Sequence, residues 1–459
     1  MCNFAVENIN RKIMKKLLFL LVLLPLLGVE AKAQVESMFG ERAVPLAGKV
    51  VRAWDAGSGL ISYYENSLGQ GTVGLVASSG TSIHEFDLPT AYRMADLRVV
   101  DSDVFMCGTM TDSNGKRGVV LRFDANELAA GTPVAIDVQE FDPAYVSRLN
   151  RMAAYQLAPD YFKVVAIGAY EELRAPYLSA VDVAVECDYQ GGVFSAAQHL
   201  MVGVRSSLEN YEHLHDVVAT DSYVAIVGNI ANVASRHISI RVGDRNDVLP
   251  TMFGAQPALY YVPTGDVPIS VNRAVAMDGD RIATACLSHD VGTQDLFRTQ
   301  IRYFDLASMT MTNSQWMRIG SKYAPAELAY VPADTSVVLL GEMDFPAPGD
   351  DNTVFVFLNP TAMAPYAAYG MYIPREPFVS ADCYGGNFVA GLSRTRWLLK
   401  DKLQPLGGNC YKYDKRDVSV DDVAPYGKLI MGYRPSNNLS TISLVKTVDR
   451  VRLILNCVH

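Results

Sequence analysis

The segment Asp96-Leu97-Arg98-Val99-Val100-Asp101-Ser102, followed by Val104-Phe105-Met106-Cys107 and Gly108, has a second copy with the same spacing. The second copy is Asp216-Val217-Val218-Ala219-Thr220-Asp221-Ser222, followed by Val224-Ala225-Ile226-Val227 and Gly228. Each copy indicates a β-strand, a tight turn at an Asp and a second strand that ends in Gly. The chain is therefore expected to repeat a unit that begins with a β-hairpin.

Looser copies of this hairpin fill the intervening sequence. Their second strands end at Gly168, Ala285, Gly341 and Gly391, so the ends of successive copies are 50 to 60 residues apart. Several copies continue with two more short apolar segments, such as 119–124 and 135–138. A drifting period of this length is typical of repeat folds with loop insertions. We count eight units of four antiparallel strands, which start near residues 46, 92, 148, 212, 271, 326, 377 and 419.

On these strands and turns the chain resembles the β-propeller superfamily, in the manner of bacterial exported WD40-like or kelch-like repeat proteins. The resemblance covers about residues 44–458 and lies in the pattern alone. Regular Gly-His and Trp-Asp pairs and a kelch double-Gly series are absent from the sequence. The resemblance implies an all-β propeller of four-stranded blades, which closes into a ring and leaves no long exposed sheet edge. Seven blades are an alternative count, and a pair of packed β-sheets is a rival fold.

Composition limits the classes of partner. The chain has 459 residues, of which 49% are hydrophobic and 19% are charged, and its formal net charge is −9. This acidic balance, with no basic run after residue 34, argues against nucleic acid or an anionic membrane as a partner. The sequence contains no GxSxG, HExxH or P-loop motif, and no GxGxxG motif in a βαβ context. We therefore predict no cofactor.

The N-terminus predicts export. Lys15 and Lys16 precede the apolar segment 17–28, and Ala31-Lys32-Ala33 then offers a signal-peptidase site. We assign residues 1–33 to a signal peptide, with 1–13 as an over-extended start before Met14. A linker at 34–45 and a single propeller domain at 46–458 follow. The predicted location is the periplasm, the extracellular space or the cell surface. No run of 18 apolar residues occurs later in the sequence, so membrane insertion is not predicted.

Six cysteines follow the predicted signal peptide, and they are scattered singly. Their spacing fits neither a CxxC motif nor a zinc site. Buried free thiols are the favoured interpretation, and Cys410 with Cys457 is the pair to test for a disulfide.

One position of the repeat carries a charge in almost every copy. This slot lies at the start of the first strand, and it holds Asp96, Arg151, Asp216, Arg273, Glu327, Ser380 and Asp422. The residue at this position in the first unit is not recognisable from the sequence. In a propeller the first strand of each blade lines the central channel, so these residues predict a ring of charge at the channel mouth.

Two interpretations of this ring remain open. It can be a structural belt, in which each arginine reaches a carboxylate of a neighbouring blade. It can also line a polar pocket for a ligand. The alternating signs favour the belt, because opposite charges on adjacent blades neutralise each other.

His213 and His215 are a weaker candidate site. Residues two apart on a strand share one face, a spacing that metal ligands can use. A third ligand has to come from another blade, so exposed or hydrogen-bonded histidines are the favoured interpretation.

These observations predict a non-catalytic binding or scaffold propeller that presents loops on one face to a protein or glycan. The alternative is a propeller enzyme acting on extracellular carbohydrate, with carboxylates of the channel mouth as acid and base. The sequence does not decide the oligomeric state.

Overall fold

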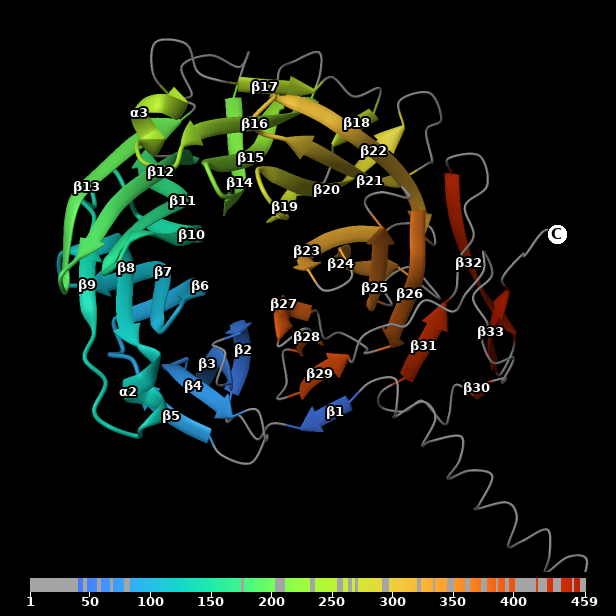
Figure 1. Cartoon of the computed structure of the whole chain (residues 1–459), viewed down its shortest axis with the longest axis horizontal. Coiled ribbons are helices and arrows are strands. Elements are labelled where there is room, and N and C mark those ends of the chain that lie inside the picture. The colour runs from blue at the N-terminus through green and yellow to red at the C-terminus, as the bar shows by residue number, and fades with distance from the viewer. Residues whose placement is uncertain are drawn as a thin grey trace, which may run out of the picture.

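The computed structural model is a ring of mainly antiparallel β-sheets around a central channel (Figure 1). It describes the backbone of residues 40–43, 48–55, 59–66, 69–77, 83–174, 177–202, 211–231, 236–253, 259–262, 266–268, 271–290, 297–319, 323–332, 335–344, 351–359, 364–372, 378–384, 387–392, 396–400, 418–419, 427–431, 439–447 and 450–454. Side-chain surroundings are described for parts of residues 61–341.

Four sheets follow the chain order strand by strand. The first contains β2 (Gly48–Asp55), β3 (Gly59–Asn66), β4 (Gly71–Ala77) and β5 (Ile83–Asp87). The second contains β6 (Tyr92–Val100), β7 (Asp103–Asp112), β8 (Gly115–Asp124) and β9 (Asp137–Glu140). The third contains β10 (Arg148–Ala158), β11 (Tyr161–Arg174), β12 (Tyr177–Gln190) and β13 (Val193–Val202). The fourth contains β14 (Tyr211–Ala219), β15 (Tyr223–Ala231), β16 (Arg236–Asp244) and β17 (Leu259–Val262).

Three further sheets include strands from distant parts of the chain. One contains β18 (Asp266–Pro268), β19 (Arg273–Ala276), β20 (Arg281–Asp290), β21 (Phe297–Asp305) and β22 (Thr310–Ile319), extended by β32 (Leu439–Thr447), β33 (Arg450–Ile454) and β30 (Val418–Ser419). The next contains β23 (Tyr323–Val331), β24 (Ser336–Asp344), β25 (Asp351–Asn359) and β26 (Ala364–Tyr372), extended by β31 (Gly427–Met431). The last contains β27 (Phe378–Tyr384), β28 (Asn387–Leu392), β29 (Arg396–Lys400) and β1 (Gly40–Ala43).

The inner strands of these sheets close the ring. Each contacts the inner strand of the next sheet, in the order β2, β6, β10, β14, β19, β23, β27 and back to β2. The last sheet is itself closed by the N-terminal strand β1, which pairs antiparallel with β29. The two ends of the ring are thus joined by backbone hydrogen bonds within one sheet.

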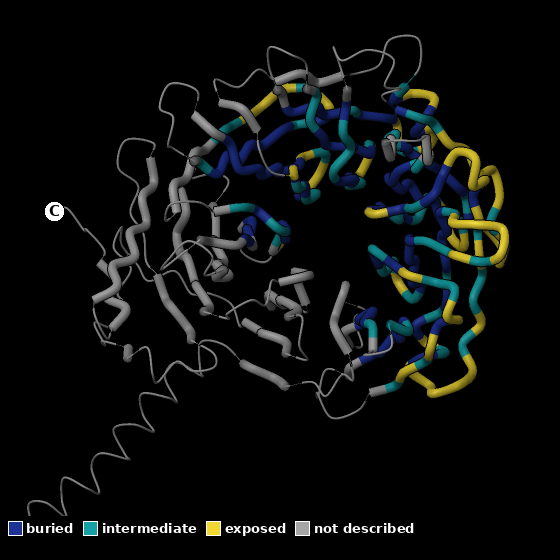
Figure 2. The backbone as a smooth tube through the Cα atoms, turned by 180° about the vertical axis from the view of Figure 1, so that it is seen from behind, coloured by how far each residue is buried: buried dark blue, intermediate teal, exposed yellow. Residues whose placement is uncertain are grey.

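The apolar core lies between neighbouring sheets. Along β7, Val104 and Met106 pack toward the sheet β2–β5, whereas Phe105 and Cys107 pack toward the sheet β10–β13. Because both faces of such a strand are buried, its sequence is a continuous apolar run without polar alternation. Figure 2 shows the same division around the described part of the ring, with buried residues inside the sheets and exposed residues at the turns and rim.

Two short helices occupy connections at the rim: α2 (Ala125–Ala129) and α3 (Val248–Phe253). The side chain of Asp124 caps α2, since its carboxylate accepts the N–H of Asn126. Val248, Leu249 and Met252 of α3 are buried against the third sheet.

The repeated glycines have a steric cause. Gly108, Gly168 and Gly228 occupy equivalent positions on the second strands β7, β11 and β15. A Cβ at any of them would collide with a carbonyl oxygen of the inner strand. The prediction that these three glycines are equivalent is therefore confirmed.

The turn between the first and second strands explains the Asp in two copies of the repeat, although Asp221 does not have the same conformation. Asp101 and Asp160 have φ angles of 55° and 56°, in the left-handed region. Asp tolerates this conformation better than most residues other than Gly and Asn.

The all-β propeller architecture is confirmed, and two packed sheets are not observed among the described strands. The count of eight units is not confirmed, because the described strands form seven sheets. The unit expected near residue 419 makes no separate blade: β31 pairs with β26 and β32 pairs with β22. The expected linker at 34–45 contains β1.

Cys107, Cys187 and Cys286 are buried and form no disulfide, as predicted. Cys410 and Cys457 lie outside the described residues, as do residues 1–33.

Candidate functional site: the charged channel

The charged slot has a defined place in the fold. On β6, β10, β14 and β23 the residue before the slot is a β-bulge, because the pairing register shifts between Met94 and Asp96 and at the equivalent places. A bulge bends the strand and redirects the next side chain. The bulge therefore fixes the backbone from which each of these slot residues extends.

The same register identifies the slot residue that the sequence did not reveal. In the first sheet the shift lies between Val50 and Arg52, so Arg52 occupies the slot on β2. On β27 the shift lies between Phe378 and Ser380, which places Ser380 as predicted. The side chains of Arg52 and Ser380 are outside the described part, and Asp422 lies wholly outside it.

The two aspartates make the same inter-sheet contact. Asp96 Oδ2 accepts the N–H of Met152, the residue after the slot on the next inner strand, at 2.9 Å. Asp216 Oδ2 accepts the N–H of Ala274, again one residue after the next slot, at 3.0 Å. In both aspartates Oδ1 accepts the N–H of the following residue. Each aspartate therefore fastens its inner strand to the next one.

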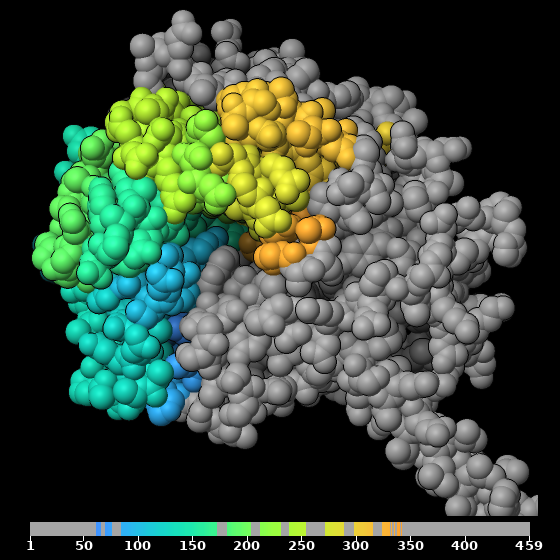
Figure 3. Space-filling view, in the orientation of Figure 1, coloured from blue at the N-terminus to red at the C-terminus, as the bar shows by residue number. Residues whose placement is uncertain are grey.

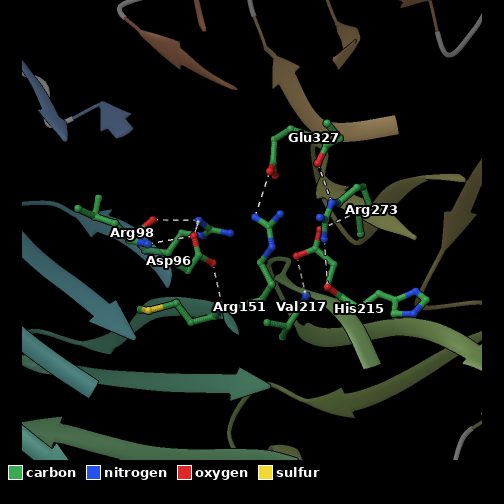
Figure 4. Close-up of polar contacts among 12 residues, drawn as sticks. Asp96, Arg98, Arg151, His215, Val217, Arg273 and Glu327 are labelled. Carbon is green, nitrogen blue, oxygen red and sulfur yellow. Dashed lines mark hydrogen bonds and ion pairs between the residues drawn. The ribbon is translucent and has the colours of Figure 1, made fainter. Parts of the chain in front are cut away.

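Arg151 forms an ion pair across the channel. Its Nη1 lies 3.0 Å from Glu327 Oε2, and the two side chains are only 9% and 10% exposed. Figure 4 shows the two side chains pointing toward each other from opposite sides. The partner differs from the expectation of a neighbouring blade, since β10 contacts β6 and β14 whereas Glu327 lies on β23. The carboxylates nearest in the ring, Asp96 and Asp216, are engaged by backbone amides instead.

The contacts of Arg273 also differ from the expected ion pair with a carboxylate of a neighbouring blade. Its guanidinium donates to the carbonyl oxygen of Ala326 at 2.7 Å and to that of His215 at 3.4 Å. Ala326 and His215 are the bulge residues of the two neighbouring inner strands. A bulge leaves a backbone carbonyl group without its usual hydrogen-bond partner in the sheet. Arg273 donates to one such carbonyl on each of the two neighbouring inner strands.

The described channel residues balance in charge. Asp96 lies 2.7 Å from Arg98 and Glu327 lies 3.0 Å from Arg151, while Arg273 acts electrostatically on Asp216. Burial raises the pKa of Asp216 to about 6, Glu327 adds to the rise, and Arg273 opposes it. In the orientation of Figure 1, the space-filling view shows the described atoms around this centre, with a hollow between them (Figure 3).

His213 and His215 have different hydrogen-bond partners and do not point at a common position. The rings of His213 and His215 are nearly parallel, and their centroids are 6.5 Å apart, so they do not converge on one point. His213 Nδ1 lies 3.2 Å from Asp182, and His215 Nδ1 accepts the N–H of Asn272. Burial lowers the pKa of His215 to about 4. Among the described residues, no group of three or more His, Cys, Asp and Glu side chains is placed to hold a metal ion.

Sequence reasoning missed Arg98 and Asn272. Arg98 is two residues after a slot, so strand alternation places it on the same face as Asp96, a clue that could have been used. Asn272 directly precedes Arg273, and its amide donates to the carbonyl oxygen of Gly228 on the neighbouring sheet. No sequence pattern pointed to that contact.

No model of a protein family matches the chain, and no curated protein matches it. Among solved structures, the chain is similar to the crystal structure of the WD40 repeats of RRP9. The two share 7% identity with a TM-score of 0.47, over 78% of this chain and 97% of that chain. No helix in the described part is long and apolar enough to cross a membrane.

The raised pKa of Asp216 predicts a pH-dependent stability. The folded protein holds this proton more tightly than the unfolded chain, whose Asp has a pKa near 3.8. Between about pH 4 and pH 6 Asp216 therefore binds more protons in the folded state than in the unfolded state. The contribution of Asp216 to the unfolding free energy then falls as the pH rises. Urea unfolding should show that wild type loses stability relative to Asp216→Asn over this window.

The matched control is Asp112→Asn, because the backbone N–H of Asn114 lowers the pKa of Asp112. Its difference from wild type should stay constant between about pH 5 and pH 7. A constant difference for Asp216→Asn over the same range would contradict the titration assigned to Asp216.

Proposed function

We propose that the chain is an exported, non-catalytic binding or scaffold propeller that presents the loops of one face to a protein or glycan. The observation that carries the proposal is the engagement of the channel charges. Asp96, Asp216, Arg151 and Arg273 hold inner strands to one another through the contacts described above. These side chains stabilise the ring, which leaves recognition to its loops and rim.

The geometry gives less support to a carbohydrate-cleaving enzyme. General acid–base catalysis needs two carboxyl groups that face a substrate. Asp216 has the raised pKa of a general acid, but it is 1% exposed and its two oxygens accept backbone N–H groups. Glu327 is paired with Arg151.

Export is the second part of the proposal, and it rests on the segment from Lys15 to Ala33. We expect mass spectrometry of the protein from the extracytoplasmic fraction to find an N-terminus within a few residues of Gln34. Recovery of the intact N-terminus from the cytosol would contradict export.

Arg273→Ala separates a structural role of the channel from a binding role. Glycan binding is to be measured with the purified mature protein on a glycan array. Protein binding is to be measured by cross-linking in intact cells. Since Arg273 donates hydrogen bonds to two part-buried carbonyl groups, its loss should lower the unfolding free energy by about 0.5–1.5 kcal/mol for each bond. We expect this loss of stability with unchanged glycan or protein binding.

The opposite outcome, unchanged stability with binding lost, would make the channel mouth the binding site. For the enzyme alternative, the matched test is hydrolysis of a polysaccharide panel. Activity that disappears in Glu327→Gln and Asp216→Asn would replace the scaffold proposal with the enzyme.

A further inference from the structure

An imidazole takes part in the junction of the fourth and fifth sheets, which the inner strands β14 and β19 form. His215 precedes the slot residue on β14, and its Nδ1 accepts the backbone N–H of Asn272 at 2.9 Å. Asn272 directly precedes β19, and its side-chain amide donates to the carbonyl oxygen of Gly228 on β15. His215 therefore adds a contact to this junction, beside the bond between Asp216 and Ala274.

The junction of the second and third sheets lacks this contact. There the residue before the slot is Ala95, whose side chain has no hydrogen-bonding atom. The bond from the slot aspartate to the next inner strand is present at both junctions. The imidazole is thus an addition at one place in a repeated arrangement, and the other junction serves as its internal comparison.

The geometry of this bond fixes the protonation state of the ring. A ring nitrogen that accepts a hydrogen bond carries no proton, so His215 is neutral and has its proton on Nε2. A second proton would turn Nδ1 into a donor and remove the bond from Asn272. It would also add a positive charge next to Arg273, whose guanidinium donates to the carbonyl oxygen of His215 at 3.4 Å.

The charged groups around His215 favour the neutral ring. Burial is the largest cause of its low pKa, and His213 on the same strand and Arg273 on β19 lower the pKa further. Asp182 on β12 acts in the opposite direction. The carboxylate of Asp182, however, lies 3.2 Å from the ring of His213 and accepts the backbone N–H of Leu214.

We propose that the hydrogen bond from Asn272 to His215 is a pH-sensitive switch at this junction. The neutral imidazole holds the start of β19 against β14, and a proton on Nδ1 releases it. Acid therefore loosens the ring between its fourth and fifth sheets, whereas the junction that carries Ala95 has no such response.

The direction of the effect follows from the two states of His215. Above its ordinary pKa of 6.5 the ring is neutral in the folded and the unfolded chain, and its stabilising contribution is complete. Because the folded state has a pKa of about 4, the unfolded chain binds more protons between pH 6.5 and pH 4, and the contribution is lost as the pH falls. Asp216 has the opposite effect over much of this range. The effect of His215 is therefore measured as a difference between variants.

The first test compares wild type with His215→Gln, because a glutamine oxygen can accept the same N–H without titrating. Urea unfolding should show that the unfolding equilibrium constant of wild type rises on the order of tenfold relative to that of His215→Gln from pH 7 to pH 5.

The second test measures the protection of the Asn272 amide by hydrogen exchange, corrected for the intrinsic rate at each pH. Relative to His215→Gln, protection in wild type should fall on the order of tenfold from pH 7 to pH 5. His215→Ala, which copies the alanine of the second sheet, should show low protection at both pH values. The control is His199→Gln, the same change at an exposed position of β13, which should behave like wild type.

The proposal is overturned if the protection of Asn272 in wild type and in His215→Gln keeps a constant ratio between pH 7 and pH 5. A purely structural role of the ring would give that result. It is also overturned if His215→Ala keeps the protection of wild type at pH 7, or if His199→Gln removes the pH response.

Discussion

The ion pair between Arg151 and Glu327 joins two inner strands, β10 and β23, that are not neighbours in the ring. Its side chains are nearly buried, so each charge is stabilised by the other where water has little access. Contacts between neighbouring sheets fix only the angle between those two sheets, whereas this ion pair spans the channel. It therefore constrains the distance between opposite sides of the ring, and the remaining channel contacts are arranged around it.

The bulge on the inner strand explains why those contacts recur. It sets the direction of the slot side chain on several inner strands, and it leaves carbonyl groups that Arg273 can bond on both sides. Next to the bulge, the inner strand lies so close to the second strand that a Cβ at Gly108, Gly168 or Gly228 would collide with one of its carbonyl oxygens. The repeated Gly and the repeated charge are thus two consequences of one backbone feature.

Local features of the fold could be predicted, and long-range ones could not. The hairpin, the turn aspartates and the position of the slot follow from spacing along one strand pair. The number of sheets does not, because the pairing of β31 with β26 joins residues far apart in the chain. The partner of Arg151 was missed for the same reason. Arg52 was missed because a bulge has no sequence pattern of its own.

The central claim, that the channel charges hold the ring together, is tested most directly by a double-mutant cycle on Arg151→Met and Glu327→Leu, measured by urea unfolding. Each single change should lower the unfolding free energy by about 3–5 kcal/mol, because it removes the ion-pair partner of a nearly buried charge, and the double change should cost much less than their sum. Lys116→Ala, which breaks an exposed ion pair with Glu171, should cost about 0–1 kcal/mol. Additive losses no larger than that of Lys116→Ala would contradict the account.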